Sequence, residues 1–165
     1  MTAASLLALT IRVMAKHRLE AVLIGNAAAA LHGSPVATQD FDFMFRNTQL
    51  NLRKLRKVAD QLGAVVMRPY YPASELFRVT RAKDGLQLDF MAKVDGIRSY
   101  ESLRARATSV RFGRHELLVA SLEDIIRSKV AADRPQDRAV LPVLRRVVRE
   151  QAKTAYAAPK HRRRA

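Results

Sequence analysis

The stretch that decides the fold of this chain is Thr38-Gln39-Asp40-Phe41-Asp42-Phe43-Met44-Phe45. Side chains of a β-strand alternate between its two faces, so a strand over 40–45 points its three phenylalanines toward one face. Asp40 and Asp42 then share the opposite face, about 7 Å apart along the chain. On an ordinary amphipathic strand both would simply face water. Because two close carboxylates repel each other, a divalent cation such as Mg²⁺ between them is the alternative that the surrounding sequence favours.

A second stretch, Leu86-Gln87-Leu88-Asp89-Phe90, repeats this pattern. Its apolar residues share one face of a strand, and Asp89 lies on the other. If the two strands are neighbours in one sheet, Asp40, Asp42 and Asp89 converge. Three carboxylates can hold two metal ions and can accept a proton from an attacking hydroxyl. The two stretches together therefore predict a carboxylate site for metal-assisted chemistry on a phosphorylated substrate.

The length of 165 residues fits one domain, expected over 1–155, followed by a basic and disordered tail over 156–165. The chain contains no cysteine, which excludes disulfides, thiolate metal sites and a cysteine nucleophile. No apolar run approaches the ~20 residues that a membrane-spanning helix needs. The beginning of the chain lacks the pattern of a signal peptide. We therefore expect a cytoplasmic protein without a membrane partner.

The net charge of +15 results from 30 basic and 15 acidic residues. An excess of this size favours an anionic partner, and nucleic acid is the commonest one. The segment 145–165 is especially basic, with Glu150 as its one acidic residue. A basic surface that merely keeps the protein soluble is the alternative. Aromatic residues make up only 6% of the chain, so a stacking platform for single strands is not indicated.

Hydrophobic periodicity and turn signals predict alternating helices and strands. We expect helices over 4–18, 27–31, 48–62, 100–105, 122–132 and 135–151. We expect strands over 21–24, 40–45 and 64–67, and two hairpins formed by 76–82 with 86–92 and by 109–112 with 116–119.

Two further features point to an anion near the carboxylates. Gly25-Asn26 follows the first strand, and a glycine at a strand-to-helix turn lets backbone N–H groups approach a phosphate. The same pair is also an ordinary turn and N-cap. Lys129 lies along or beside the apolar face of helix 122–132, where it either snorkels to water or meets an anion. We favour phosphate binding, because carboxylate–metal chemistry on a nucleotide needs such a cation.

The ordered set Gly25-Asn26, His32-Gly33-Ser34-Pro35 and Thr38–Asp42 resembles the nucleotidyltransferase superfamily, which is related to DNA polymerase β. The later segments 120–129 and 134–137 resemble the subgroup that includes abortive-infection-type nucleotidyltransferase toxins. The resemblance covers about residues 19–148. Asn26 departs from the usual Gly or Ser, and Val36 stands where relatives often carry arginine. Arg134 and Asp137 also have a purely structural interpretation, which we favour, because Pro135 starts a helix and Asp137 lies in its first turn.

The resemblance implies an α/β (α+β) nucleotidyltransferase fold, with a mixed sheet flanked by helices and a C-terminal helix pair. It implies an enzyme that uses Mg²⁺ or Mn²⁺ to move a nucleoside monophosphate from an NTP, such as ATP, to an acceptor hydroxyl. The residues that it assigns fall into two groups. Asp40, Asp42 and Asp89 would be the catalytic and metal-binding carboxylates, with Asp89 as the base. Gly25, Asn26, Thr38 and Lys129 would bind the nucleotide.

The acceptor stays open at this stage. The charge and the complete aspartate set favour an RNA end, such as that of tRNA. The subgroup resemblance implies a toxin with a cognate antitoxin protein as its partner. One alternative is transfer to a small molecule, such as an antibiotic, or to a protein side chain. The other is a non-catalytic or antitoxin-type binding module with the same fold.

Overall fold

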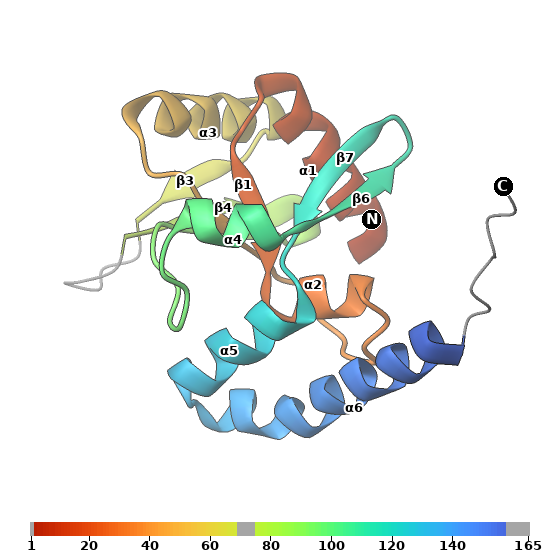
Figure 1. Ribbon diagram of the computed structural model, residues 1–165. Helices are drawn as coiled ribbons and strands as arrows, with labels where there is room; N and C mark the ends of the chain where they lie inside the picture. The colour runs from red at the N-terminus through yellow and green to blue at the C-terminus, as the bar shows by residue number, and fades with distance from the viewer. Residues whose placement is uncertain (1, 69–74, 158–165) are drawn as a thin grey trace, which may run out of the picture.

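The aspartate-bearing stretch forms a central strand of a mixed sheet. Figure 1 shows the helices arranged around this sheet. The computed structural model describes residues 2–68 and 75–157. Within these ranges seven strands pair in the order β3-β4-β5-β2-β1-β7-β6. Their bounds are β1 Ala21–Ile24, β2 Phe41–Phe45, β3 Val65–Met67, β4 Leu76–Arg81, β5 Leu86–Met91, β6 Thr108–Phe112 and β7 His115–Val119. Strand β2 runs parallel to β5 and antiparallel to β1. The predicted mixed, partly antiparallel sheet is thus confirmed.

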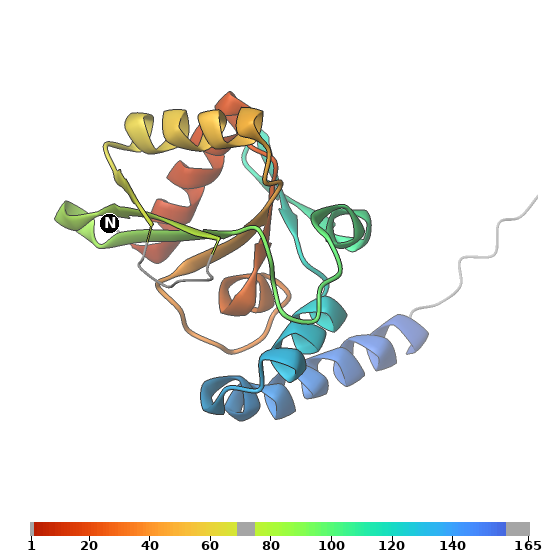
Figure 2. The ribbon, with the colours of Figure 1, turned by 90° about the vertical axis from the view of Figure 1, so that its left-hand side faces the viewer.

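Helices cover both faces of this sheet (Figure 2). On one face, α1 (Ala3–His17) contacts α3 (Gln49–Leu62). On the other, α2 (Gly25–Leu31) packs on β1 and β2 and contacts α5 (Leu122–Ala132). The last helix, α6 (Pro135–Ala157), packs against α5, and α4 (Tyr100–Arg106) flanks the sheet. None of the helices in the described ranges combines the length and apolar character that a membrane crossing needs.

The three phenylalanines of β2 form the centre of the core, as their alternation predicts. Phe41, Phe43 and Phe45 are all buried. Phe43 stacks on Phe90 of β5 with ring centroids 4.9 Å apart, and Phe45 meets the same ring edge-on. Aromatic pairs of this kind stabilise a core beyond the area that they bury.

The structure corrects several predicted boundaries. Strand β2 begins at Phe41, so Asp40 lies just before the strand. Helix α2 begins at Gly25, two residues earlier than expected. Helix α6 continues through Ala157 instead of ending at 151, because three of the six added residues are alanine, which favours helix. The predicted tail therefore starts inside α6, and its residues 158–165 lie outside the described part of the chain.

One buried amide links α3 to the sheet. Asn51 is fully buried, and its Oδ1 accepts a hydrogen bond of 2.9 Å from the backbone N–H of Glu20. Its Nδ2 donates to the carbonyls of Glu20 (2.9 Å) and Arg46 (2.8 Å). These residues lie just before β1 and just after β2. The side chain therefore satisfies backbone groups at the ends of both central strands.

We predict that Asn51→Ala lowers the free energy of unfolding by about 1–3 kcal/mol, because it leaves the Glu20 N–H without a partner and removes one of the two hydrogen bonds that the carbonyls of Glu20 and Arg46 each accept. Urea denaturation followed by circular dichroism measures this loss. The matched control is Asn47→Ala, since Asn47 is exposed. Equal stabilities of the two variants would contradict the role of Asn51.

Candidate active site

A cavity of about 560 Å³ collects the residues that the sequence singled out. Its walls come from the sheet strands β2, β4 and β5 and from helices α2 and α5, with the start of α6 at its rim. All seven predicted site residues line it, namely Gly25, Asn26, Thr38, Asp40, Asp42, Asp89 and Lys129. Segments more than 100 residues apart in sequence thus meet in one place.

A row of three charged side chains crosses the sheet at the floor of this cavity. Asp42 of β2 and Asp89 of β5 are directly paired in the parallel register. Asp89 in turn pairs with Arg78 of β4 in the antiparallel register. Partners in register point to the same face of a sheet. The two carboxylates are therefore neighbours, and a guanidinium follows them.

Arg78 holds both oxygens of Asp89. Its Nε donates to Oδ1 and its Nη2 donates to Oδ2, each over 2.7 Å. This bidentate pair is the strong geometry for an arginine and a carboxylate, and it raises the pKa of Arg78 further. Sequence reasoning missed Arg78. Counting outward from the predicted turn Lys83-Asp84-Gly85 places Val79 opposite Asp89, whereas the observed connection has four residues, Ala82–Gly85, and this shifts Arg78 into that position.

Asp42 makes no ion pair with any described residue. Burial raises the pKa of its carboxyl to about 6, and the charges of Asp89 and Asp40 add to the effect. Lys129 and Arg134 oppose the rise. Because its ionised form is disfavoured in the metal-free protein, this carboxylate is suited to bind a cation.

The turn after β1 approaches Asp42 so closely that only glycine fits. Gly25 has a φ of +69°, a backbone conformation that side chains disfavour. A Cβ at this position would also lie 2.8 Å from Oδ2 of Asp42. The neighbouring Asn26 has a buried Oδ1 that lacks a hydrogen-bond partner. An acceptor without a protein partner at the wall of a cavity is available to contact a ligand or water.

Thr38 and Asp40 lie at the rim of the cavity. The Thr38 hydroxyl donates to the Asp40 carbonyl (3.1 Å) and accepts from the Asp40 N–H (3.2 Å). This local turn fixes the backbone of Asp40 next to the strand. Thr38 therefore orients Asp40 in the present structure, a role that the resemblance did not assign.

Lys129 points into the cavity region with only 11% of its side chain exposed. Its Nζ donates to Oδ1 of Asp137 over 3.2 Å. The other oxygen of Asp137, Oδ2, accepts no hydrogen bond. It forms an ion pair with Arg134, whose Nε lies 3.1 Å away. The interpretation of Asp137 as a residue of the first helical turn was thus incomplete, because its buried carboxylate also holds two cations at the cavity.

The carboxylates do not form a ready metal cluster. Within the described residues, no three His, Asp or Glu side chains are already arranged to hold an ion. Asp89 is not free to join such a cluster, because the guanidinium of Arg78 binds both of its oxygens in place of a metal ion. The donor set nevertheless fits Mg²⁺ or Mn²⁺, since Asp40, Asp42 and the unpartnered Asn26 Oδ1 are all hard oxygen ligands.

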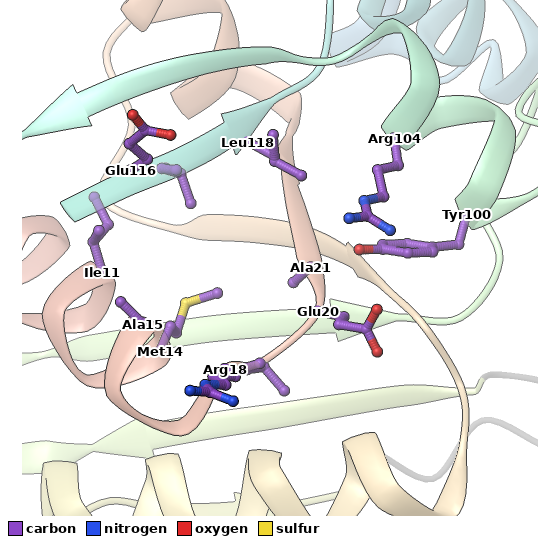
Figure 3. A pocket seen from close by; sticks show the side chains of 12 residues that line it. Ile11, Met14, Ala15, Arg18, Glu20, Ala21, Tyr100, Arg104, Glu116 and Leu118 are labelled. Atoms are coloured by element: carbon purple, nitrogen blue, oxygen red, sulfur yellow. The ribbon is translucent and has the colours of Figure 1, made fainter.

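A smaller cavity of about 220 Å³ lies elsewhere, between α1, β1, α4 and β7 (Figure 3). Tyr100 and Arg104 of α4 face Glu20 across it. It shares no lining residue with the carboxylate cavity and contains none of the predicted site residues.

The raised pKa of Asp42 predicts a pH-dependent stability in EDTA. The native carboxyl keeps its proton up to about pH 6, whereas the unfolded one loses it near 3.8, so the wild type loses stability as pH rises between these values. Asp42→Asn should therefore be more stable than the wild type by about 1–3 kcal/mol at pH 7, and the difference should nearly vanish below the unfolded pKa. Urea unfolding at both pH values checks this. A constant difference, or one that also occurs in the exposed control Asp60→Asn, would contradict it.

Solved structures with the same fold exist. The antibiotic-resistance factor ANT(2'')-Ia, in complex with adenylyl-2''-tobramycin, aligns with a TM-score of 0.63 and 16% identity, over 95% of this chain and 100% of that one. A protein of Thermotoga maritima classed as a nucleotidyltransferase aligns with a TM-score of 0.59 and 16% identity, over 86% and 89%. A nucleotidyltransferase-like antigen of Paracoccidioides brasiliensis aligns at 0.52 and 14%, over 86% and 74%. At these identities the likeness establishes the fold alone.

No curated protein sequence matches the chain. A family model does match, over residues 3–163, and its description is a nucleotidyl transferase of unknown function (DUF2204). This match spans nearly the whole chain and includes every residue of the cavity. The protein therefore belongs to this nucleotidyl transferase family and is an enzyme of the nucleotidyltransferase class.

Proposed function

We propose that the protein is a divalent-metal-dependent enzyme that moves a nucleoside monophosphate from an NTP to a hydroxyl at the end of an RNA, such as a tRNA. The observation that carries the proposal is the in-register pair Asp42–Asp89 at the floor of a cavity that also contains Lys129. Carboxylates and a phosphate-binding cation are the two charge types that this reaction needs.

Asp40 and Asp42 would hold Mg²⁺ or Mn²⁺, and Asp89 would join them once Arg78 releases one or both of its oxygens. When bound, the ion would offset the charge of the triphosphate and of the attacking oxygen. The burial of Asp42 and its repulsion by Asp89 favour this binding, because a cation stabilises both ionised carboxylates.

The triphosphate would lie between the turn after β1 and the start of α6. Gly25 lets the backbone approach a phosphate, and the side-chain NH₂ group of Asn26 would donate to it. Lys129 and Arg134 would offset the charge that develops on the leaving pyrophosphate. Asp137 would keep Lys129 in place for this role.

Asp89 would act as the base that accepts the proton of the acceptor hydroxyl. Its exposed fraction of only 8% limits access of bulk water to this carboxylate. Arg78 holds it in one orientation until substrate and metal are present. Arg78 is therefore a positioning residue in this proposal.

The net charge of +15 supports an RNA acceptor, because a polyanion gains most from such a surface. The subgroup resemblance extends the proposal to a toxin that a cognate antitoxin restrains. The second candidate is transfer to an antibiotic hydroxyl, which the structural likeness to ANT(2'')-Ia favours.

The test is transfer of label from each α-³²P-NTP, with Mg²⁺ or Mn²⁺, to total RNA in one arm and to a panel of aminoglycosides in the other. We expect label in RNA, its loss in EDTA, and a loss of at least about 10²-fold in Asp42→Asn, a variant that stays folded. Label only in an aminoglycoside would replace the RNA proposal with the second candidate. Full activity of Asp42→Asn would refute the carboxylate site.

Lys129→Ala should weaken NTP affinity by about tenfold or more, because it removes a charged partner of the phosphates. Lys129→Arg should recover only part of the affinity, since a planar fork replaces a compact charge. Calorimetric titration with a non-hydrolysable NTP measures both. The matched control is Lys93→Ala, because Lys93 lines the same cavity but is largely exposed. If both alanine variants bind the NTP as the wild type does, Lys129 has no role in binding.

A further inference from the structure

Helix α6 starts at the candidate active site and leads away from it. Gln136 and Asp137 in its first turn line the carboxylate cavity. The helix then continues for 23 residues in all, about 34 Å, and its far end projects beyond the other elements (Figure 2). It therefore joins the cavity to a distant part of the surface.

The outer face of α6 carries a stripe of positive charge. Four cationic residues follow one another at helical spacing and are all exposed; they are Arg138, Arg145, Arg149 and Lys153. Spacings of seven, four and four residues keep them on one side of the helix. The buried Leu141 and Leu144 lie on the adjoining side of the helix, which packs toward the body of the protein, so the stripe runs along the edge of the packed side. We call these four residues the α6 stripe.

Most of this charge is not neutralised within the protein. Arg138 pairs with Asp133 at 3.0 Å, on an exposed part of the surface. The other three stripe residues make no ion pair with any residue that the structure describes. Arg146 beside the stripe adds another exposed cation, and Glu150 is the one acidic residue between 138 and 157. The stripe is thus available to an anionic partner.

We propose that the α6 stripe is the track for the phosphate backbone of the RNA acceptor, whose terminal hydroxyl enters the carboxylate cavity. This inference rests on the proposed function. The stripe extends about 22 Å along the helix axis, which corresponds to roughly six nucleotides at ~3.4 Å per nucleotide. The helix begins at the cavity, so a strand bound along it is directed to the site. The track recognises phosphates and not bases, so it sets acceptor length more than acceptor sequence.

A second basic surface on α3 provides a matched control. Arg53, Arg56 and Lys57 are exposed and make no ion pair with described residues. Helix α3 itself lies across the sheet from α5 and α6 (Figure 2). An RNA bound there is not directed into the cavity, although the contribution to net charge is the same.

The experiment compares two triple charge reversals that change the net charge equally. One is Arg145→Glu with Arg149→Glu and Lys153→Glu in α6, and the other is Arg53→Glu with Arg56→Glu and Lys57→Glu in α3. Fluorescence anisotropy with a labelled RNA of roughly 12 nucleotides, twice the span of the stripe, gives affinity as a function of salt. Calorimetry with a non-hydrolysable NTP reports on the integrity of the cavity.

We expect the α6 variant to lose at least about 30-fold in RNA affinity. The slope of log affinity against log salt concentration should fall in magnitude by about 2, because three phosphate contacts are lost at ~0.7 each for a single strand. The NTP affinity of this variant and its rate of nucleoside monophosphate transfer to a dinucleotide should match those of the wild type. The RNA affinity, the NTP affinity and the transfer rate of the α3 variant should each stay within about threefold of the wild-type values. Neutral Arg145→Gln with Arg149→Gln and Lys153→Gln should give an intermediate loss, which supports the track independently of any damage by the introduced glutamates.

Equal losses in the α6 and α3 variants would overturn the proposal, because net charge alone would then explain RNA binding. An unchanged RNA affinity of the α6 variant would overturn it too, and the stripe would then face a different partner, such as an acidic protein. If the wild type binds RNA through the stripe but labels none, the proposed function fails and the track stands.

Discussion

The constraint on which the site depends is the register between β2 and β5, which places Asp42 and Asp89 side by side on one face of the sheet. Two carboxylates at the floor of a cavity repel each other, and burial adds to the cost of ionising them. A neighbouring cationic side chain neutralises only one of the two carboxylates. Arg78 binds both oxygens of Asp89, whereas Asp42 has no cationic partner in the described chain. The pair is therefore incomplete without a further positive charge.

The rest of the cavity follows from this incomplete pair. Gly25 leaves room beside Asp42 because a Cβ would collide with its carboxylate. Lys129 is held above the floor by Asp137 and does not contact the two aspartates, so its charge lowers the pKa of Asp42 without pairing with it. The same arrangement leaves positive charge for a phosphate. In the proposed function, the carboxylates would bind a metal ion and Lys129 would contact a phosphate.

Local rules predicted the features that depend on neighbours in sequence. The period of two in 41–45 gave the phenylalanine core, the repeated pattern in 86–90 found Asp89, and helical spacing placed Lys129 at the cavity. Arg78 and the full role of Asp137 depend on which strands and helices meet, so neither was visible in its own segment. The start of β2 at Phe41 was missed for a related reason, since the Thr38 turn ends the extended segment before Asp40.

The most direct test is a crystal structure with Mn²⁺ and a non-hydrolysable NTP, in which anomalous scattering locates the metal. The account predicts a manganese peak between the carboxylates of Asp40 and Asp42, with at least one Asp89 oxygen released from Arg78 and turned toward the triphosphate. A manganese peak away from these aspartates, or a bound triphosphate beside an intact Arg78–Asp89 pair and no metal at Asp42, would contradict it.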